Sequence, residues 1–322
     1  MLSHSFFGLL AVSLPLLVNA TTWKPVKIGG GGGFVPGIVF STKTKGVAYA
    51  RTDIGGLYKL NSDDTWTALT DWVGSSNWHN WGVDALALDP TNSKKLYIAV
   101  GMYTNSWDPN NGAILASSDG GSTWTEYPLS FKVGGNMPGR GIGERLAVDP
   151  NSPNILFFGA RSGNGLWKST DSGATWTQVT SFPSVGTYVQ DAAYEYTSDI
   201  VGLAWVTFDA SSSSSGSATK RIFVGVANVG STSIYYTEDA GSTWTAVPGQ
   251  PTTNNLPHKG VISPSERLLY VSFNNNAGPY DGSLGSVQKY NITSQTWTDI
   301  TPVSGSDLYF GFGGLDVDLQ RP

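Results

Sequence analysis

The stretch Ser117-Ser118-Asp119-Gly120-Gly121-Ser122-Thr123-Trp124 has the form Ser/Thr-x-Asp-x-Gly-x-Thr-Trp, and this form recurs along the 322-residue chain. Two further copies end at Trp176 and Trp244, and degenerate copies end at Trp66 and Trp297. The copies return roughly every 50 to 70 residues, which is the signature of a protein built from repeated structural units.

The sequence around each copy predicts strands. Runs of β-branched and aromatic residues, such as 96–100 and 155–158, follow Asp-Pro turns at Asp89-Pro90 and Asp149-Pro150. No stretch keeps a helical period, so each repeat reads as four strands. Four-stranded units of this length are the blades of β-propellers. We therefore predict an all-β propeller with about five blades and the start of a sixth.

The repeated motif resembles the Asp-box, a hairpin turn whose aspartate caps backbone N–H groups and whose tryptophan packs between neighbouring sheets. A catalytic residue is needed once, whereas a repeat places Asp119, Asp171 and Asp239 equivalently in different blades. We therefore interpret these three aspartates as structural and expect them on peripheral turns.

Composition excludes several classes of function. A net charge of −5 with 19 basic residues argues against nucleic-acid binding. The chain has no cysteine and only three histidines, His4, His79 and His258, so neither a metal site nor a cofactor is expected.

The first twenty residues carry an apolar run, 6–18, that ends at Val18-Asn19-Ala20. We interpret residues 1–20 as a secretory signal peptide and residues 21–322 as the mature domain, secreted and extracellular. No later segment is apolar for long enough to cross a membrane, so no membrane partner is expected.

Asp53 is the candidate for chemistry, because it follows a predicted strand and precedes Gly55-Gly56. Catalytic groups often lie at strand ends and on loops of a rigid scaffold. Trp78 and Trp81 crowd into a polar loop further along, where indole faces could stack on sugar rings. Packing between blades is an equally good interpretation of these tryptophans.

Several longer segments of the chain resemble the family 74 glycoside hydrolases, which are xyloglucan-degrading endo-β-1,4-glucanases. The resemblance covers residues 21–322 and is carried by the segments 50–58, 81–90, 102–109, 139–146 and 313–320.

The resemblance implies two seven-bladed propellers that face each other across a cleft and hydrolyse xyloglucan with inversion. It makes Asp53 the general base and makes Trp78, Trp81, Trp107 and Arg140 candidates for substrate binding. Packing remains an alternative for Trp107, and pairing with Glu144 or an exposed carboxylate remains one for Arg140. We expect the Asp53 carboxylate to be partly exposed among aromatic side chains.

The resemblance also implies that the general acid comes from the second propeller, which would lie outside these residues. The chain is therefore expected to be an incomplete N-terminal propeller, inactive and poorly stable by itself. Two rival interpretations are a non-catalytic Asp-box propeller that binds carbohydrate or protein, and a sialidase. A sialidase needs an arginine cluster on the substrate carboxylate and a tyrosine nucleophile, and the sequence contexts of the arginines match the glucanase better.

Overall fold

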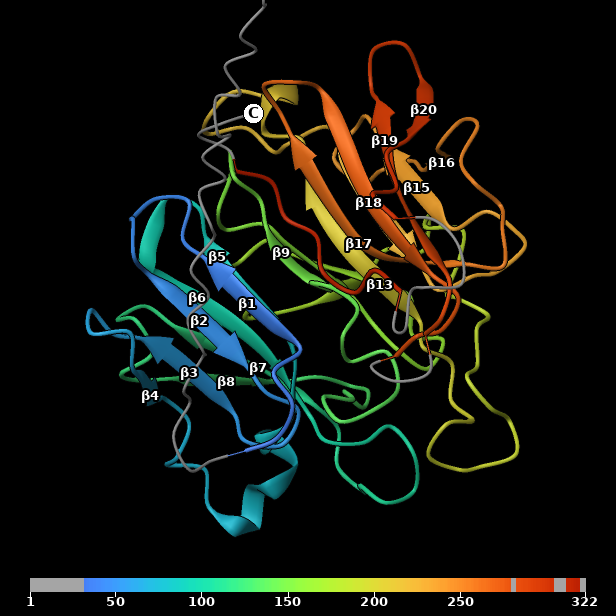
Figure 1. The fold of residues 1–322 in the computed structure, drawn as a ribbon. Coiled ribbons are helices and arrows are strands. Elements are labelled where there is room, and N and C mark those ends of the chain that lie inside the picture. The colour runs from blue at the N-terminus through green and yellow to red at the C-terminus, as the bar shows by residue number, and fades with distance from the viewer. Residues whose placement is uncertain (1–31, 279–281, 304–310, 319–322) are drawn as a thin grey trace, which may run out of the picture.

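Five four-stranded antiparallel sheets, set in a ring, form the computed structural model, which describes residues 32–278, 282–303 and 311–318 (Figure 1). In every sheet the strands are hydrogen-bonded in their order along the chain. The sheets are the blades of a β-propeller, so the predicted all-β class and its five blades are confirmed. The proposed signal peptide, 1–20, lies outside the described residues.

The strands and the two short 3-10 helices have the following bounds. Blade one comprises β1 (Gly37–Phe40), β2 (Ala48–Arg51), β3 (Leu57–Leu60) and β4 (Trp66–Ala68), followed by the helix η1 (Ser75–Trp81). Blade two comprises β5 (Val83–Asp89), β6 (Asn92–Val100), β7 (Ala113–Ser117) and β8 (Thr125–Pro128). Blade three comprises β9 (Leu146–Val148), β10 (Leu156–Gly159), β11 (Leu166–Ser169) and β12 (Thr177–Gln178). Blade four comprises β13 (Leu203–Phe208), η2 (Ala210–Ser212), β14 (Ile222–Val226), β15 (Ile234–Thr237) and β16 (Thr245–Ala246). Blade five comprises β17 (Leu256–Ser263), β18 (Leu268–Asn274), β19 (Gly285–Asn291) and β20 (Thr296–Asp299).

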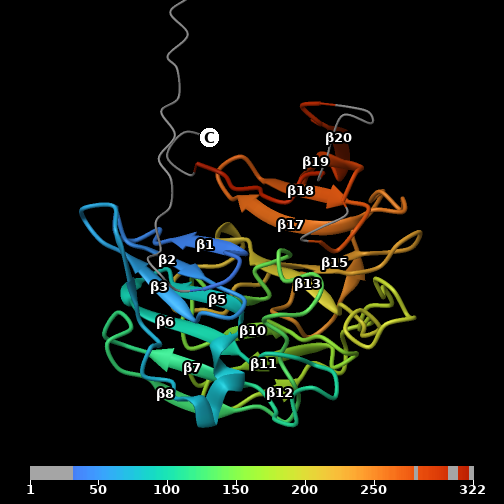
Figure 2. The ribbon, with the colours of Figure 1, turned by 60° about the horizontal axis from the view of Figure 1, so that its bottom comes forward.

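The first strands of the blades lie side by side, β1 against β5, β5 against β9, β9 against β13, and β13 against β17 (Figures 1 and 2). The apolar core is divided into four clusters, and each cluster joins side chains of two successive blades. The motif tryptophans pack against these clusters, each on the cluster shared with the preceding blade: Trp124, Trp176, Trp244 and Trp297. The tryptophan of the motif thus holds neighbouring sheets together.

The motif turns lie between the third and fourth strands of a blade and are closed by their aspartates. Asp119 Oδ1 accepts hydrogen bonds from the backbone N–H groups of Ser122 and Thr123, both at 2.9 Å, and Oδ2 accepts the Thr123 hydroxyl at 2.6 Å. That hydroxyl is the main reason why the pKa of Asp119 falls to about 2. Asp171 and Asp239 make the same bonds to Thr175 and Thr243, and all three aspartates are exposed on their turns, as expected.

A cavity of about 770 Å³ separates blade one from blade five. Its walls come from β1, from residues 259–261 of β17 and from residues 315–318. The described part of this last segment, 311–318, forms no strand, so the opening of a sixth blade stays a prediction, as does a total of seven blades. No helix in the described part of the chain is long and apolar enough to cross a membrane.

Replacing Trp176 by Ala should lower the free energy of unfolding by about 3 kcal/mol, the lower end of the range for a large aromatic side chain. The indole lies partly buried on the cluster between blades two and three, and its Nε1 donates to Gly173 O at 2.9 Å. Urea denaturation followed by circular dichroism measures the change. Trp66→Ala is the matched control, because Trp66 is also partly buried but belongs to none of the four clusters. Equal losses in the two variants would contradict the role of the motif tryptophan at the interface.

Candidate active site

The Asp53 loop connects β2 to β3 and is fixed by its own hydrogen bonds. The Thr52 hydroxyl accepts Gly55 N–H at 2.9 Å and donates to Gly56 O at 2.9 Å. Gly56 has a φ of 79°, in the left-handed region that glycine adopts without strain. The two glycines that follow Asp53 therefore serve the turn that presents the carboxylate.

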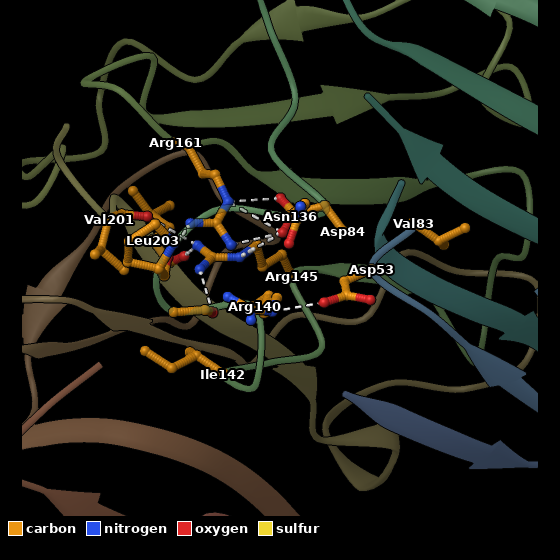
Figure 3. Close-up of polar contacts among 12 residues, drawn as sticks. Asp53, Val83, Asp84, Asn136, Arg140, Ile142, Arg145, Arg161, Val201 and Leu203 are labelled. Carbon is orange, nitrogen blue, oxygen red and sulfur yellow. Dashed lines mark hydrogen bonds and ion pairs between the residues drawn. The ribbon is translucent and has the colours of Figure 1, made fainter. Parts of the chain in front are cut away.

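Asp53 is buried, with 5 % of its surface exposed, so the expectation of a partly exposed carboxylate is wrong. Two groups close over it. The Phe34 N–H donates to Oδ1 at 2.8 Å, and the Arg140 Nε lies 2.9 Å from Oδ2 (Figure 3). Asp53 nevertheless differs from the motif aspartates, because it lies between the second and third strands of its blade and pairs with an arginine.

Arg140 joins the carboxylate to the aromatic side chains. Its Nη1 donates to the Tyr196 hydroxyl at 3.1 Å, and its guanidinium lies 5.7 Å from the centre of the Phe34 ring. The ion pair with Asp53 replaces the expected alternative of a pair with Glu144, which binds Arg51 instead at 2.7 Å.

Three other arginines hold the segment that carries Arg140. They are Arg51 on β2, Arg145 before β9 and Arg161 after β10, and all are buried. Their guanidinium groups donate to the backbone carbonyls of four residues at 2.7–3.4 Å: Pro138, Gly139, Arg140 and Ile142. A loop without regular structure is thereby fixed at four of its five residues from 138 to 142.

A buried carboxylate balances two of these arginines. Asp84, on β5, receives Arg161 Nη2 at 2.7 Å and Nε at 2.9 Å, and Arg145 Nε lies 3.7 Å away (Figure 3). Burial acts to raise the pKa of Asp84, but the charges of Arg161 and Arg145 outweigh it and hold that pKa below its usual range. Burial and the neighbouring Arg161 lower the pKa of Arg145 to about 9.

A group of aromatic rings, one of them exposed, lies next to the Arg140 side chain. Trp107 is 51 % exposed and stacks on Tyr196, with ring centres 5.7 Å apart and an interplanar angle of 11°. Tyr103 contacts both Trp107 and Trp78, at 5.4 and 6.3 Å between ring centres. The structure therefore brings Trp78, Trp107 and Arg140 into one group, linked by tyrosines.

Trp81 joins this group through its backbone. Its carbonyl accepts Gly56 N–H at 2.8 Å, which ties it to the Asp53 loop. Its indole is 37 % exposed and donates to Val73 O at 3.0 Å.

Sequence reasoning missed the linking residues Tyr103, Tyr196 and Phe34. Tyr103 lies inside one of the family-like segments, which was a usable signal, whereas Tyr196 stands in a loop without any motif. The described residues hold no cluster of three or more His, Asp or Glu side chains that could bind a metal ion.

The site thus places a carboxylate at a strand end of a β-propeller, beside a group of aromatic rings. No family model matches the chain. Individual relatives do match. A xyloglucanase from Hypocrea jecorina is 64% identical over 306 residues, which cover 94% of this chain and 36% of the relative. A xyloglucanase from Paenibacillus is 60% identical over 318 residues, covering 96% of this chain and 31% of the relative.

Among solved structures, the GH74 xyloglucanase from Xanthomonas campestris superposes with a TM-score of 0.80 at 40% identity. The match covers 90% of this chain and 41% of that one. Over most of its own length the chain is therefore similar to GH74 xyloglucanases. It spans about one third of the length of the curated relatives it matches.

Replacing Asp84 by Asn should destabilise the protein by about 3–5 kcal/mol at pH 7, because it leaves two buried guanidinium groups without their carboxylate. The folded pKa of Asp84 is depressed, so its contribution is present above the unfolded pKa of about 3.9 and lost as pH falls through the folded value. The stability gap between wild type and Asp84→Asn should therefore narrow below about pH 4. Urea unfolding between pH 7 and pH 3 tests this, and a gap that stays constant with pH would contradict it.

Proposed function

We propose that this chain is part of a secreted enzyme that hydrolyses the β-1,4-glucan backbone of xyloglucan with inversion. The observation that carries the proposal is 64% identity over nearly the whole chain to a protein named xyloglucanase, together with the Asp53 and Arg140 pair at the strand end. The candidate signal peptide supports secretion.

Asp53 is our candidate for the general base. Each carboxylate oxygen can accept more than one hydrogen bond. In the described part of the chain Phe34 N–H binds Oδ1, and Arg140 Nε pairs with Oδ2. The remaining acceptor positions could orient and deprotonate a water.

The general acid is the second requirement of an inverting hydrolase, at roughly 6.5–9.5 Å from the base. The family resemblance assigns this acid to a second propeller, which would be the partner of the present one. We therefore propose that residues 21–322 alone hydrolyse xyloglucan poorly or not at all.

Trp107, Trp78 and Trp81 are our candidates for the surface that holds the glucan. Trp107 presents an exposed indole whose orientation is fixed by Tyr196 and Tyr103, so a sugar ring can stack on it without first ordering the side chain. Arg140 would contribute to substrate binding indirectly, because it contacts Asp53 and Tyr196 and holds both side chains in position.

One observation favours the rival function of a non-catalytic propeller that binds carbohydrate. Asp53 is buried and ion-paired, which suits a structural carboxylate as well as a base. A test of catalysis therefore has to separate loss of turnover from loss of binding and folding.

Replacing Asp53 by Asn in the longest natural form of the protein should lower kcat on xyloglucan by about 10²–10⁴-fold, the usual contribution of general base catalysis. Reducing-sugar release from tamarind xyloglucan measures turnover, and thermal unfolding checks the fold. Asp119→Asn is the matched control, because that carboxylate closes a peripheral turn. A drop of less than tenfold in a folded Asp53→Asn protein would point to another base. Oligosaccharide binding without any turnover in the wild-type protein would support the rival.

Replacing Trp107 by Ala should weaken the binding of xyloglucan oligosaccharides by about 1–3 kcal/mol, a magnitude borrowed from stacking of bases on aromatic side chains. Isothermal titration calorimetry measures the affinity. Trp72→Ala serves as control, since Trp72 is equally exposed and has no described aromatic contact with Tyr103 or Tyr196. A loss of thermal stability with unchanged affinity would instead show that Trp107 only packs.

A further inference from the structure

The turn between β19 and β20 carries a sequence pattern that the proposed chemistry does not use. Residues Asn291-Ile292-Thr293 have the form Asn-x-Ser/Thr, without proline in the middle, which is the acceptor pattern for N-glycosylation. The pattern occurs once more in the chain, at Asn19, but removal of the candidate signal peptide, 1–20, would remove that asparagine. Residues 21–322 therefore hold a single acceptor pattern.

This turn is open to solvent. β19 ends at Asn291, β20 begins at Thr296, and residues 293–295 between them are all exposed. Figure 1 shows the hairpin projecting from the ring at the top of the view. Ile292 is the buried residue of the turn, and it packs into the apolar cluster shared by blades four and five. One side chain thus anchors the turn, and its other residues leave room for a bulky group.

The Asn291 side chain presents its amide nitrogen to solvent. Its Oδ1 accepts the N–H groups of Thr293 and Ser294, both at 2.9 Å. Its Nδ2 has no hydrogen-bond partner in the described part of the chain and is not buried. N-glycosylation attaches the sugar to Nδ2 and leaves Oδ1 unchanged. A glycan on Asn291 is therefore compatible with both hydrogen bonds that close the turn.

The turn also lies at the opposite end of its blade from the turn type that carries Asp53. Asp53 stands between the second and third strands of blade one, whereas Asn291 leads from the third strand of blade five to the fourth. Successive turns of an antiparallel sheet lie at opposite ends of the shared strand. The blades share one strand order, and their first strands lie side by side. A glycan on Asn291 would therefore extend away from the candidate active site.

We propose that Asn291 is an N-glycosylation site of the exported chain. The inference rests on the secretion that forms part of the proposed function. The co-substrate is a lipid-linked oligosaccharide diphosphate. Nδ2 attacks the anomeric carbon of its first sugar, so that a C–N bond forms and the C–O bond to the diphosphate breaks. The lipid diphosphate leaves with the electron pair of that bond, and Nδ2 releases one of its two protons.

Expression of residues 1–322 in a yeast host tests the proposal, because the secretory pathway of yeast supplies the lipid-linked oligosaccharide. Medium and cell lysate are both treated with peptide-N-glycosidase F in ¹⁸O-water, which converts a glycosylated asparagine into ¹⁸O-labelled aspartate. Peptide mass spectrometry then locates the label. We expect it at position 291, together with a gain in electrophoretic mobility after the digestion.

The hydroxyl residue of the pattern provides matched variants. Asn291→Gln and Thr293→Ala should both lose the mobility shift, whereas Thr293→Ser should keep it, because serine also satisfies the pattern. Asn61 is the internal control. It lies where β3 leads to β4 in blade one, but Asp63 stands at its third position, so it should remain unlabelled. A mobility shift that persists in Thr293→Ala, or a label at Asn61, would contradict the proposal.

The N-terminus of the recovered chain separates two kinds of failure. A chain from which residues 1–20 have been cleaved and which carries no label at Asn291 overturns the present inference and leaves the proposed secretion in place. A chain that retains residues 1–20 and carries no label overturns both, because Asn291 would then never meet the lipid-linked oligosaccharide. A cleaved chain with the label at Asn291 supports both.

Discussion

The candidate site depends on the ion pairs of the Asp84 carboxylate with Arg161 and Arg145. Burial of Arg145 and Arg161 in the middle of the ring is costly unless an anion compensates them, and Asp84 provides that anion with a two-atom contact to Arg161. The remaining N–H groups of these arginines then bind backbone carbonyls. The Asp84 carboxylate on β5 therefore stabilises the two arginines that fix the loop of residues 138–142.

That loop leads directly to the candidate base. Arg161, Arg145 and Arg51 bind the carbonyls of residues 138–142, and Arg140 projects from this segment to Asp53. The same Arg140 binds the hydroxyl of Tyr196, on which Trp107 stacks. One chain of direct contacts therefore runs from a buried carboxylate at the ring centre to an exposed indole, through groups from blades one, two and three and the loop before blade four.

The sequence was a good guide where structure is specified locally. The repeated motif predicted five blades and the bonds of Asp119, Asp171 and Asp239, since each turn is closed by residues three or four positions apart. The central network was not predictable in this way, because Arg161 and Asp84 are separated by 77 positions and no local pattern pairs them. The same reason explains the error on Asp53. The strand end and the two glycines were recognisable, but its cover comes from Phe34 and Arg140, which are distant in the chain.

Repetition itself explains where function can reside in such a fold. The motif aspartates close equivalent turns in different blades, and this equivalence leaves little room for a unique task. The blades differ from one another outside the repeated motif, in the Asp53 turn, in η1 and in the loops around Tyr103 and Tyr196. The Asp53 turn contacts η1 through Gly56 N–H and Trp81 O, and Arg140 contacts Tyr196. The repeated part of each blade thus supplies rigidity, and the residues that differ between blades supply the chemistry.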